Sequence, residues 1–231
     1  MWVGSKLSRM EHASISSFLK LGYKYHLYVY EDVQNVPQGA DLLDGNNILP
    51  SDQMFLYSGD KSRGGGSISG FSNYFRYELL HKKGGFWVDT DVFCLRELPE
   101  EDYIFVEETD GLIASCIMKA PQGSEFANEC KRLCSLKDPN YITWGETGPQ
   151  LVTRVAEDLE MQSWVKASSD YFPIMWTDME RFFQKGNIPT SITVHFWNEM
   201  WRRKGLDKNA TYDRQTIYER IVSTLSEPKF I

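Results

Sequence analysis

The chain has 231 residues, which is enough for one large domain with a substantial buried core. Hydrophobic residues make up 42% and charged residues 25%, as in ordinary globular proteins, so neither a disordered nor a fibrous chain is expected. The formal net charge of -7 argues against nucleic acid as a partner, because phosphate backbones select basic surfaces.

The first part of the chain predicts the start of a wound α/β sheet. Ser8 and Glu11 have the spacing of a capping box at the start of a helix over residues 8–20. The β-branched and aromatic run at 25–32 then predicts a strand. Residues 58–70 contain three consecutive glycines among small polar neighbours, which predicts a loop.

A second helix and a short inner strand follow that loop. Apolar residues recur at helical spacing over 71–83, and Gly84 and Gly85 are expected to end this helix. The apolar run at 86–89 predicts the strand. Further on we expect strands at 102–108 and 111–120, helices at 124–136 and 147–161, a strand region at 170–176, a motif at 191–201 and a helix at 214–225.

No segment of the sequence is predicted to span a membrane, because no run of about 18 apolar residues is present. The first residues also lack the pattern of a signal peptide, so we expect a cytoplasmic protein. The basic residues at 202–204 leave peripheral contact with the inner face of a membrane open, and the oligomeric state is open as well. Reduced and mostly buried thiols are expected for the cysteines, namely Cys94, Cys116, Cys130 and Cys134.

Two aspartates separated by one residue follow the inner strand. In an extended strand, positions i and i+2 point to the same side, so the carboxylates of Asp89 and Asp91 are expected to face one side. Two close carboxylates repel, and a divalent cation such as Mn²⁺ or Mg²⁺ removes that penalty. The motif alone also fits a simpler alternative, in which one aspartate caps a turn and the other is solvated.

The surroundings of the D-x-D motif favour the metal hypothesis. Ligands bind at the carboxyl ends of strands in open α/β sheets, which is where these aspartates stand. Arg76 lies on the helix that precedes the strand, and arginine recognises phosphate through planar, bidentate hydrogen bonds. We therefore expect a cation, an arginine and a glycine-rich loop to converge on a diphosphate.

The stretch FSNYFRYELLHKKGGFWVDTDVFCL (71–95) resembles the DXD-containing sugar-binding region of glycosyltransferase family 32. That family includes initiating mannosyltransferases and alpha-1,4-galactosyltransferase-like enzymes. MWVG at the start, WGETGPQLVT (144–153) and VHFWNEMW (194–201) extend the resemblance in the expected order.

This resemblance implies a single GT-A glycosyltransferase domain over residues 1–231. Such a fold is α/β, with a mixed central sheet and a Rossmann-like nucleotide-binding half flanked by helices. The implied reaction is a metal-dependent, retaining transfer of a hexose from a nucleotide-diphosphate sugar to a saccharide acceptor. A UDP-sugar is favoured as the donor, and a surface polysaccharide, such as a capsule, or another glycan as the acceptor.

The resemblance also implies roles for individual residues. Contacts with the donor are implied for Trp2, Asn73, Arg76, Asp89, Gly148 and Pro149. Trp2 would stack on the donor base, and Asp89 would hold the ribose or the donor sugar. Asp91 and His195 would ligate the metal, while Arg76 and Asp89 are the implied catalytic groups.

Some positions depart from the family pattern or have another explanation. Asn73 stands where many relatives have an aspartate, and Ser115 and Cys116 stand where an asparagine near the acceptor is common. Trp2 also fits a core residue of the first strand. His195, between two apolar residues, also fits a hydrogen-bonded core histidine.

Two other functions are alternatives to sugar transfer. A phosphatase of the haloacid dehalogenase type also has D-x-D after an apolar strand, but the sequence lacks the G-D-x-x-x-D motif that such enzymes need. A non-catalytic sugar-binding or nucleotide-sugar-binding protein with the same fold is the main alternative. For the transfer itself, retention needs a carboxylate nucleophile or attack on the same face, and no carboxylate is clearly placed, so same-face attack is favoured.

Overall fold

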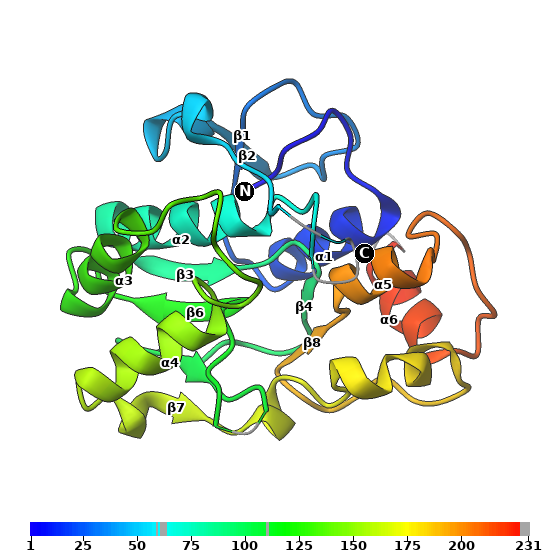
Figure 1. The fold of residues 1–231 in the computed structure, drawn as a ribbon. Helices are drawn as coiled ribbons and strands as arrows, with labels where there is room; N and C mark the ends of the chain where they lie inside the picture. The colour runs from blue at the N-terminus through cyan, green and yellow to red at the C-terminus, as the bar shows by residue number, and fades with distance from the viewer. Residues whose placement is uncertain (59, 61–63, 110, 227–231) are drawn as a thin grey trace. The chain divides into compact units, whose positions relative to one another are not determined.

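The computed structural model describes residues 1–58, 60, 64–109 and 111–226. Its helices and strands form a mixed α/β architecture, which confirms the predicted fold class (Figure 1). Part of the predicted loop at 58–70, namely 59 and 61–63, lies outside the described residues.

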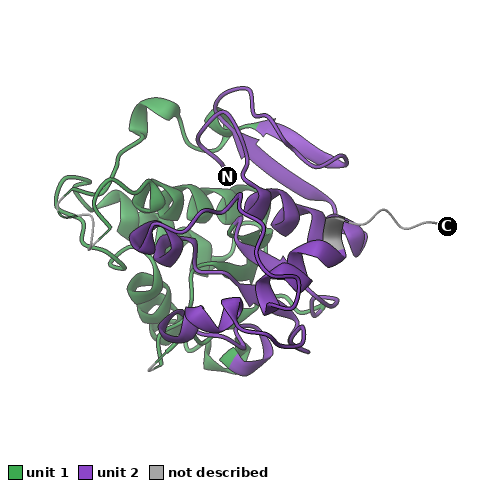
Figure 2. Ribbon diagram, turned by 90° about the vertical axis from the view of Figure 1, so that its right-hand side faces the viewer, with its two compact units in different colours: residues 1, 44–89, 100–168 green, residues 2–43, 90–99, 169–231 purple. Residues whose placement is uncertain are grey.

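The chain divides into two compact units, which Figure 2 colours separately. Unit 1 consists of residues 1, 44–89 and 100–168, and unit 2 consists of residues 2–43, 90–99 and 169–231. The expectation of one domain over 1–231 stays a prediction.

The helices of unit 1 lie close to the predicted positions: α2 (Ser69–Lys83), α3 (Glu125–Ser135) and α4 (Pro149–Asp158). Gly84 ends α2 with a φ of 66°, and a Cβ there would lie 2.4 Å from the backbone nitrogen of Gln122. Both the left-handed backbone and the close approach therefore require glycine at this position. α2 packs against α3 and covers the strands that follow it (Figure 1).

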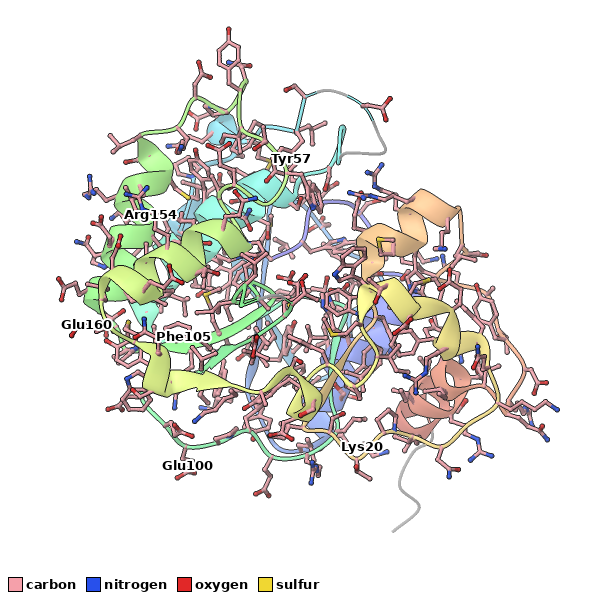
Figure 3. All side chains as sticks on the ribbon, turned by 60° about the horizontal axis from the view of Figure 1, so that its bottom comes forward. Lys20, Tyr57, Glu100, Phe105, Arg154 and Glu160 are labelled. Atoms are coloured by element: carbon pink, nitrogen blue, oxygen red, sulfur yellow. The ribbon has the colours of Figure 1, made fainter. Side chains whose placement is uncertain are left out.

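The strands of unit 1 are β3 (Gly85–Val88), β5 (Phe105–Val106), β6 (Ile117–Ala120) and β7 (Val165–Lys166). β3 pairs antiparallel with β6, with Trp87 opposite Met118. An antiparallel bridge between Ile104 and Lys119 continues from β6 to the start of β5, and β5 pairs parallel with β7. The pairing in unit 1 is therefore mixed, and its inner residues, such as Phe105, are fully buried (Figure 3).

Unit 2 begins with α1 (Arg9–Lys20), whose capping box forms as the sequence predicts. The backbone N–H of Ser8 donates to Oε2 of Glu11 at 2.9 Å, and the backbone N–H of Met10 donates to Oγ of Ser8 at 3.2 Å. Two paired strands follow, β1 (Tyr25–Val29) and β2 (Ala40–Asp44). The other elements of unit 2 are β4 (Val92–Cys94), β8 (Thr193–His195), α5 (Asn198–Lys204) and α6 (Ile217–Ser226).

Buried hydroxyl groups of α1 fix the position of β4. Oγ of Ser14 donates to the carbonyl of Val92 at 2.6 Å, and Oγ of Ser17 accepts from the backbone N–H of Cys94 at 2.9 Å. β4 pairs antiparallel with β8, so that Val92 lies opposite His195. α1 also packs against α6, which completes the core of this unit.

The predicted strand at 170–176 is wrong. This region consists of a short 3₁₀ turn, Ser168–Asp170, a turn, and the start of a longer 3₁₀ helix, Trp176–Phe183. Pro173 has no backbone N–H to give to a ladder, which disfavours a strand here. Other short 3₁₀ helices are Gly45–Asn47, Ser51–Gln53 and Gln162–Trp164.

None of the helices in the described part of the chain combines the length and the apolar character that crossing a bilayer requires.

Candidate active site

The D-x-D motif lies where the chain passes from β3 to β4. Asp89 directly follows β3, as predicted, but residues 90 and 91 form a turn before β4 begins. The premise that strand alternation points both carboxylates the same way is therefore wrong, because the motif is not extended. Asp89 belongs to unit 1 and Asp91 to unit 2, so each carboxylate has its own surroundings.

Asp89 is held by hydrogen bonds within unit 1. Its backbone N–H donates to the carbonyl of Cys116 at 2.7 Å, which extends the β3–β6 ladder by one residue. Its Oδ1 accepts from Nε1 of Trp87 at 2.7 Å and from Nη2 of Arg76 at 3.2 Å. The side chain keeps 29% of its surface exposed, so a ligand can reach this oriented carboxylate.

The guanidinium group of Arg76 is buried, with 3% of the side chain exposed. Its Nη1 donates to the carbonyl of Ser115, and its Nε donates to the carbonyl of Ser72 at 3.3 Å. Its centre also lies 4.9 Å from the centroid of the Trp87 ring. In this structure Arg76 positions Asp89, and a direct contact with a donor phosphate stays a prediction.

The predicted donor contacts Asn73 and Gly148 come together in unit 1. Nδ2 of Asn73 donates to Oγ1 of Thr147 at 3.2 Å. A Cβ on Gly148 would lie 3.3 Å from both Nδ2 of Asn73 and Oγ of Ser115, so a larger residue there requires these side chains to shift by a few tenths of an ångström. Pro149 then opens α4, where its missing N–H costs no helical hydrogen bond.

Asp91 and His195 form a buried pair in unit 2. Nε2 of His195 lies 3.1 Å from Oδ2 of Asp91, and the backbone N–H of Asn198 donates to the same oxygen at 2.7 Å. Burial would raise the pKa of Asp91, but the charge of His195 and these hydrogen bonds outweigh it and hold the pKa below its usual value. A carboxylate therefore persists here despite only 6% exposure.

Aromatic rings fix the orientation of His195. The centroid of its ring lies 4.0 Å from that of Trp197 and 5.9 Å from that of Phe172. Trp197 has a φ of 56°, unusual for a residue with a large side chain, and it precedes Asn198 at the start of α5. No sequence pattern indicates the Asn198 contact, because a backbone N–H makes it.

The Asp91–His195 pair fits a divalent cation. Carboxylate oxygen and imidazole nitrogen are both ligands for Mn²⁺, and neighbouring ligands of a six-coordinate cation lie about 3 Å apart when the bonds are about 2.1 Å. The observed separation of 3.1 Å matches this spacing. Among the described residues, no group of three or more His, Cys, Asp or Glu side chains could hold a metal.

Trp2 lies in unit 2 beside the first paired strand. Its backbone N–H donates to the carbonyl of Tyr28 at 2.8 Å, and it forms a parallel bridge with Val29. Its Nε1 is buried and has no hydrogen-bond partner among the described residues. Nζ of Lys208 lies 5.7 Å from the centroid of the indole ring. Stacking on a donor base stays a prediction for this residue.

The basic cluster at 202–204 is matched by acidic side chains. Glu199 pairs with Arg202 at 2.7 Å and with Arg203 at 2.8 Å, and Glu180 pairs with Lys204. The cluster therefore offers little unbalanced positive charge, and the expected membrane contact stays a prediction.

Two family models match consecutive parts of the chain. The glycosyltransferase sugar-binding region containing a DXD motif matches residues 11–110, which include Arg76, Asp89 and Asp91. The alpha 1,4-glycosyltransferase conserved region matches residues 120–224, which include His195. Both matched regions are those of glycosyltransferases, and together they run through most of the chain. The resemblance found in the sequence is thereby confirmed.

Individual glycosyltransferases are similar to the chain at low identity. Human alpha-1,4-N-acetylglucosaminyltransferase is 25% identical over 142 residues, which is 54% of this chain and 41% of that enzyme. Human lactosylceramide 4-alpha-galactosyltransferase is 25% identical over 142 residues, which is 54% of this chain and 40% of that enzyme. The match thus spans about two fifths of the length of these relatives. The solved structure of the PaToxG glycosyltransferase covers 97% of this chain and 83% of its own, with a TM-score of 0.49 and 11% identity.

Proposed function

We propose that the chain is a metal-dependent, retaining glycosyltransferase that moves a hexose from a UDP-sugar to a saccharide acceptor. The matches to two glycosyltransferase family models support the reaction class. The buried Asp91–His195 pair carries the metal part of the proposal, because it presents an oxygen and a nitrogen ligand at the spacing that a cation needs.

The cation is Mn²⁺ or Mg²⁺, held by Asp91 and His195. When bound, it neutralises charge on the donor diphosphate. The two side chains are oriented without it, since Asn198 holds the carboxylate and Trp197 packs on the imidazole. Little reorganisation is needed when the ligand binds, which favours affinity.

Residues of unit 1 bind the sugar part of the donor. Asp89 accepts hydrogen bonds from the ribose or the hexose, and Arg76 holds its carboxylate in position. Asn73 and the close-packed Gly148 and Pro149 line the approach to the hexose. Trp2 is assigned to the donor base, and its buried Nε1 needs a hydrogen-bond acceptor.

Same-face attack is the proposed route to retention. The bond between C1 of the hexose and the diphosphate oxygen breaks, and the acceptor hydroxyl oxygen bonds to C1 on the same face. The hydroxyl proton passes to the leaving phosphate oxygen. The names of the relatives support an alpha-1,4 linkage in the product. The acceptor is proposed to belong to a surface polysaccharide or another glycan.

The test is donor cleavage and product analysis. Wild-type chain is incubated with UDP-galactose, UDP-glucose, UDP-N-acetylglucosamine or GDP-mannose, with Mn²⁺ or with EDTA, and release of the nucleoside diphosphate is measured. Release that requires Mn²⁺ and is lost in Asp91→Asn supports the proposal, and proton NMR then gives the anomeric configuration. Asp41→Asn is the matched control, because Asp41 forms an exposed pair with His26 at 3.5 Å.

The alternative is a protein that binds nucleotide sugars without cleaving them. It predicts donor binding with no release of nucleoside diphosphate from any of these donors. That outcome contradicts the enzyme proposal.

A further inference from the structure

Unit 1 exposes two aromatic side chains on the segment that leads into α4. Tyr141 is 81% exposed and Trp144 is 39% exposed. Rings of this size are usually buried, and exposed ones near polar groups mark binding surfaces. Neither residue is among the assigned donor contacts. We call these two side chains the aromatic platform.

The indole ring of Trp144 is fixed by its neighbours. The centroid of the Tyr57 ring lies 5.4 Å from that of Trp144, and Tyr57 itself packs against the first turn of α2 (Figure 3). Gly64, with a φ of 90°, lies on the indole, because a Cβ at that position would be 2.0 Å from Cε3 of Trp144. Glycine is therefore required there, and the ring is held while part of it stays exposed.

The turn that carries Trp144 is held by one acidic side chain. Oε2 of Glu146 accepts from the backbone N–H of Thr143 at 2.9 Å and from Oγ1 of Thr143 at 3.0 Å. Oε1 of Glu146 lies 2.7 Å from Nζ of Lys137. The pKa of Glu146 is lowered mainly by its contact with the Lys137 ammonium and to a smaller extent by the hydrogen bonds from Thr143. These contacts therefore persist at neutral pH. The turn is thus ordered before any ligand binds.

The same turn leads directly to the proposed donor contacts. Trp144 and Thr147 are three residues apart, and Thr147 accepts the hydrogen bond from Asn73 at 3.2 Å. The segment before the turn is tied down as well, because Oγ of Ser58 donates to the carbonyl of Asn140 at 3.0 Å. The aromatic platform is therefore continuous with the part of unit 1 that is assigned to the donor hexose.

We propose that the aromatic platform, Tyr141 and Trp144, binds the acceptor saccharide by stacking against the C–H face of a sugar ring. Flat, rigid rings beside hydrogen-bonding groups suit this chemistry, and the turn supplies Thr143 and Glu146 next to the indole. This role rests on the proposed transfer reaction, since an acceptor is needed only if the chain transfers sugars.

A bilayer surface is the competing occupant of this patch. Leu56 and Leu136 are also exposed, at 56% and 68%, and aliphatic side chains insert into lipid but do not stack on sugars. The exposed Asp138 adjoins the platform, however, since its carbonyl accepts from the backbone N–H of Tyr141, and its carboxylate disfavours an anionic membrane. The saccharide is therefore favoured, and vesicle binding is included in the test.

The experiment is binding of the whole chain to an array of immobilised glycans. Wild type is compared with Tyr141→Ser, Trp144→Ala and the control Leu136→Ser, which removes an apolar side chain that is 68% exposed and lies outside the platform. We expect binding of wild type to a subset of glycans, a loss of about tenfold in both platform variants, and no change in the control. Tyr141→Ser is expected to fold normally, because the side chain is exposed.

The proposal is overturned if wild type binds no glycan, or if both platform variants bind as well as wild type. Binding to phosphatidylcholine and phosphatidylserine vesicles that is lost in the platform variants, with no loss of glycan binding, also overturns it. Release of UDP by wild type without acceptor is measured separately. If that release is absent while glycan binding depends on the platform, the transfer proposal fails and the saccharide site stands.

Discussion

Nε2 of His195 lies 3.1 Å from Oδ2 of Asp91, although 104 residues separate the two in the chain. The antiparallel pairing of β4 with β8 creates this contact, because it sets Val92 opposite His195. Asp91 directly precedes β4, so the register places its carboxylate beside the imidazole. The central claim is that this pair holds the cation of a nucleotide-sugar transferase.

Removing the imidazole is expected to weaken metal binding. In His195→Ala, the cation keeps Asp91 as its protein ligand, and we expect the affinity for Mn²⁺ in the presence of UDP to fall by at least about tenfold. Titration calorimetry measures this loss. The matched control is His26→Ala, since His26 forms an exposed pair with Asp41 and should leave the affinity unchanged. If His195→Ala binds Mn²⁺ as tightly as wild type but is much less stable, His195 is a core residue and not a metal ligand.

Replacing the buried guanidinium group is expected to destabilise unit 1. In Arg76→Lys, an ammonium group cannot reproduce the bonds to Ser72, Ser115 and Asp89. We expect the free energy of unfolding to fall by about 1–3 kcal/mol, because buried acceptors lose their donors. Urea denaturation measures the loss, with the exposed Arg132→Lys as the control. Equal midpoints for Arg76→Lys and wild type contradict the positioning role of Arg76.

The sequence predicted the elements with strong local signals. The capping box of Ser8 and Glu11 and the glycine stop at Gly84 mark the ends of α1 and α2 where the structure has them. The sequence analysis missed shorter elements such as β2, β4, β7 and α5. A segment of two to seven residues is too short to show a clear hydrophobic periodicity. The prediction at 170–176 went wrong because an apolar, aromatic run was given more weight than Pro173.

The site residues also divide into those that a local sequence pattern indicates and those that depend on tertiary contacts. The roles of the predicted site residues stay predictions, but the structure pairs Asp89 with Arg76 and Asp91 with His195 through hydrogen bonds. The contact from Asn198 was missed because it depends on a backbone N–H that a left-handed Trp197 aims at Asp91. Local sequence does not specify such a contact, since it exists only once β4 and β8 pair.

The cysteines are expected to resist modification in the folded protein. All four are buried and none forms a disulfide, and burial raises the pKa of Cys94 and Cys134 to about 12. Thiolate is the reactive form, so labelling at about pH 8 should be slow until the chain is unfolded in guanidinium chloride. Thiol counting with an aromatic disulfide reagent measures both states. Rapid labelling of the native chain, or fewer than four thiols in the unfolded chain, contradicts this account.

Acid is expected to destabilise unit 2 through Glu219. Burial would raise the pKa of this carboxyl, but hydrogen bonds from Arg9 at 2.9 Å and from the backbone N–H of Tyr212 at 3.1 Å lower it overall. Because the folded pKa lies below the unfolded value, the stabilisation is present above about pH 4.5 and is lost as the pH falls through the folded pKa.

Urea midpoints measured from about pH 7 down to pH 3 test this linkage. Glu219→Gln should lower the midpoint at neutral pH and flatten its fall in acid. The exposed pair of Glu129 with Arg132 supplies the control, Glu129→Gln, which should behave as wild type. The same acid slope in Glu219→Gln and wild type rules out Glu219 as its source.

The most direct test of the central claim is calorimetric titration of UDP into the chain, with Mn²⁺ and again with EDTA. Wild type should bind UDP in Mn²⁺ and lose at least about tenfold in affinity in EDTA, because the diphosphate needs the cation held by Asp91 and His195. Asp91→Asn in Mn²⁺ should bind as weakly as wild type in EDTA. Equal affinity of wild type in Mn²⁺ and EDTA, or undiminished binding by Asp91→Asn, contradicts the claim that this pair is the metal site.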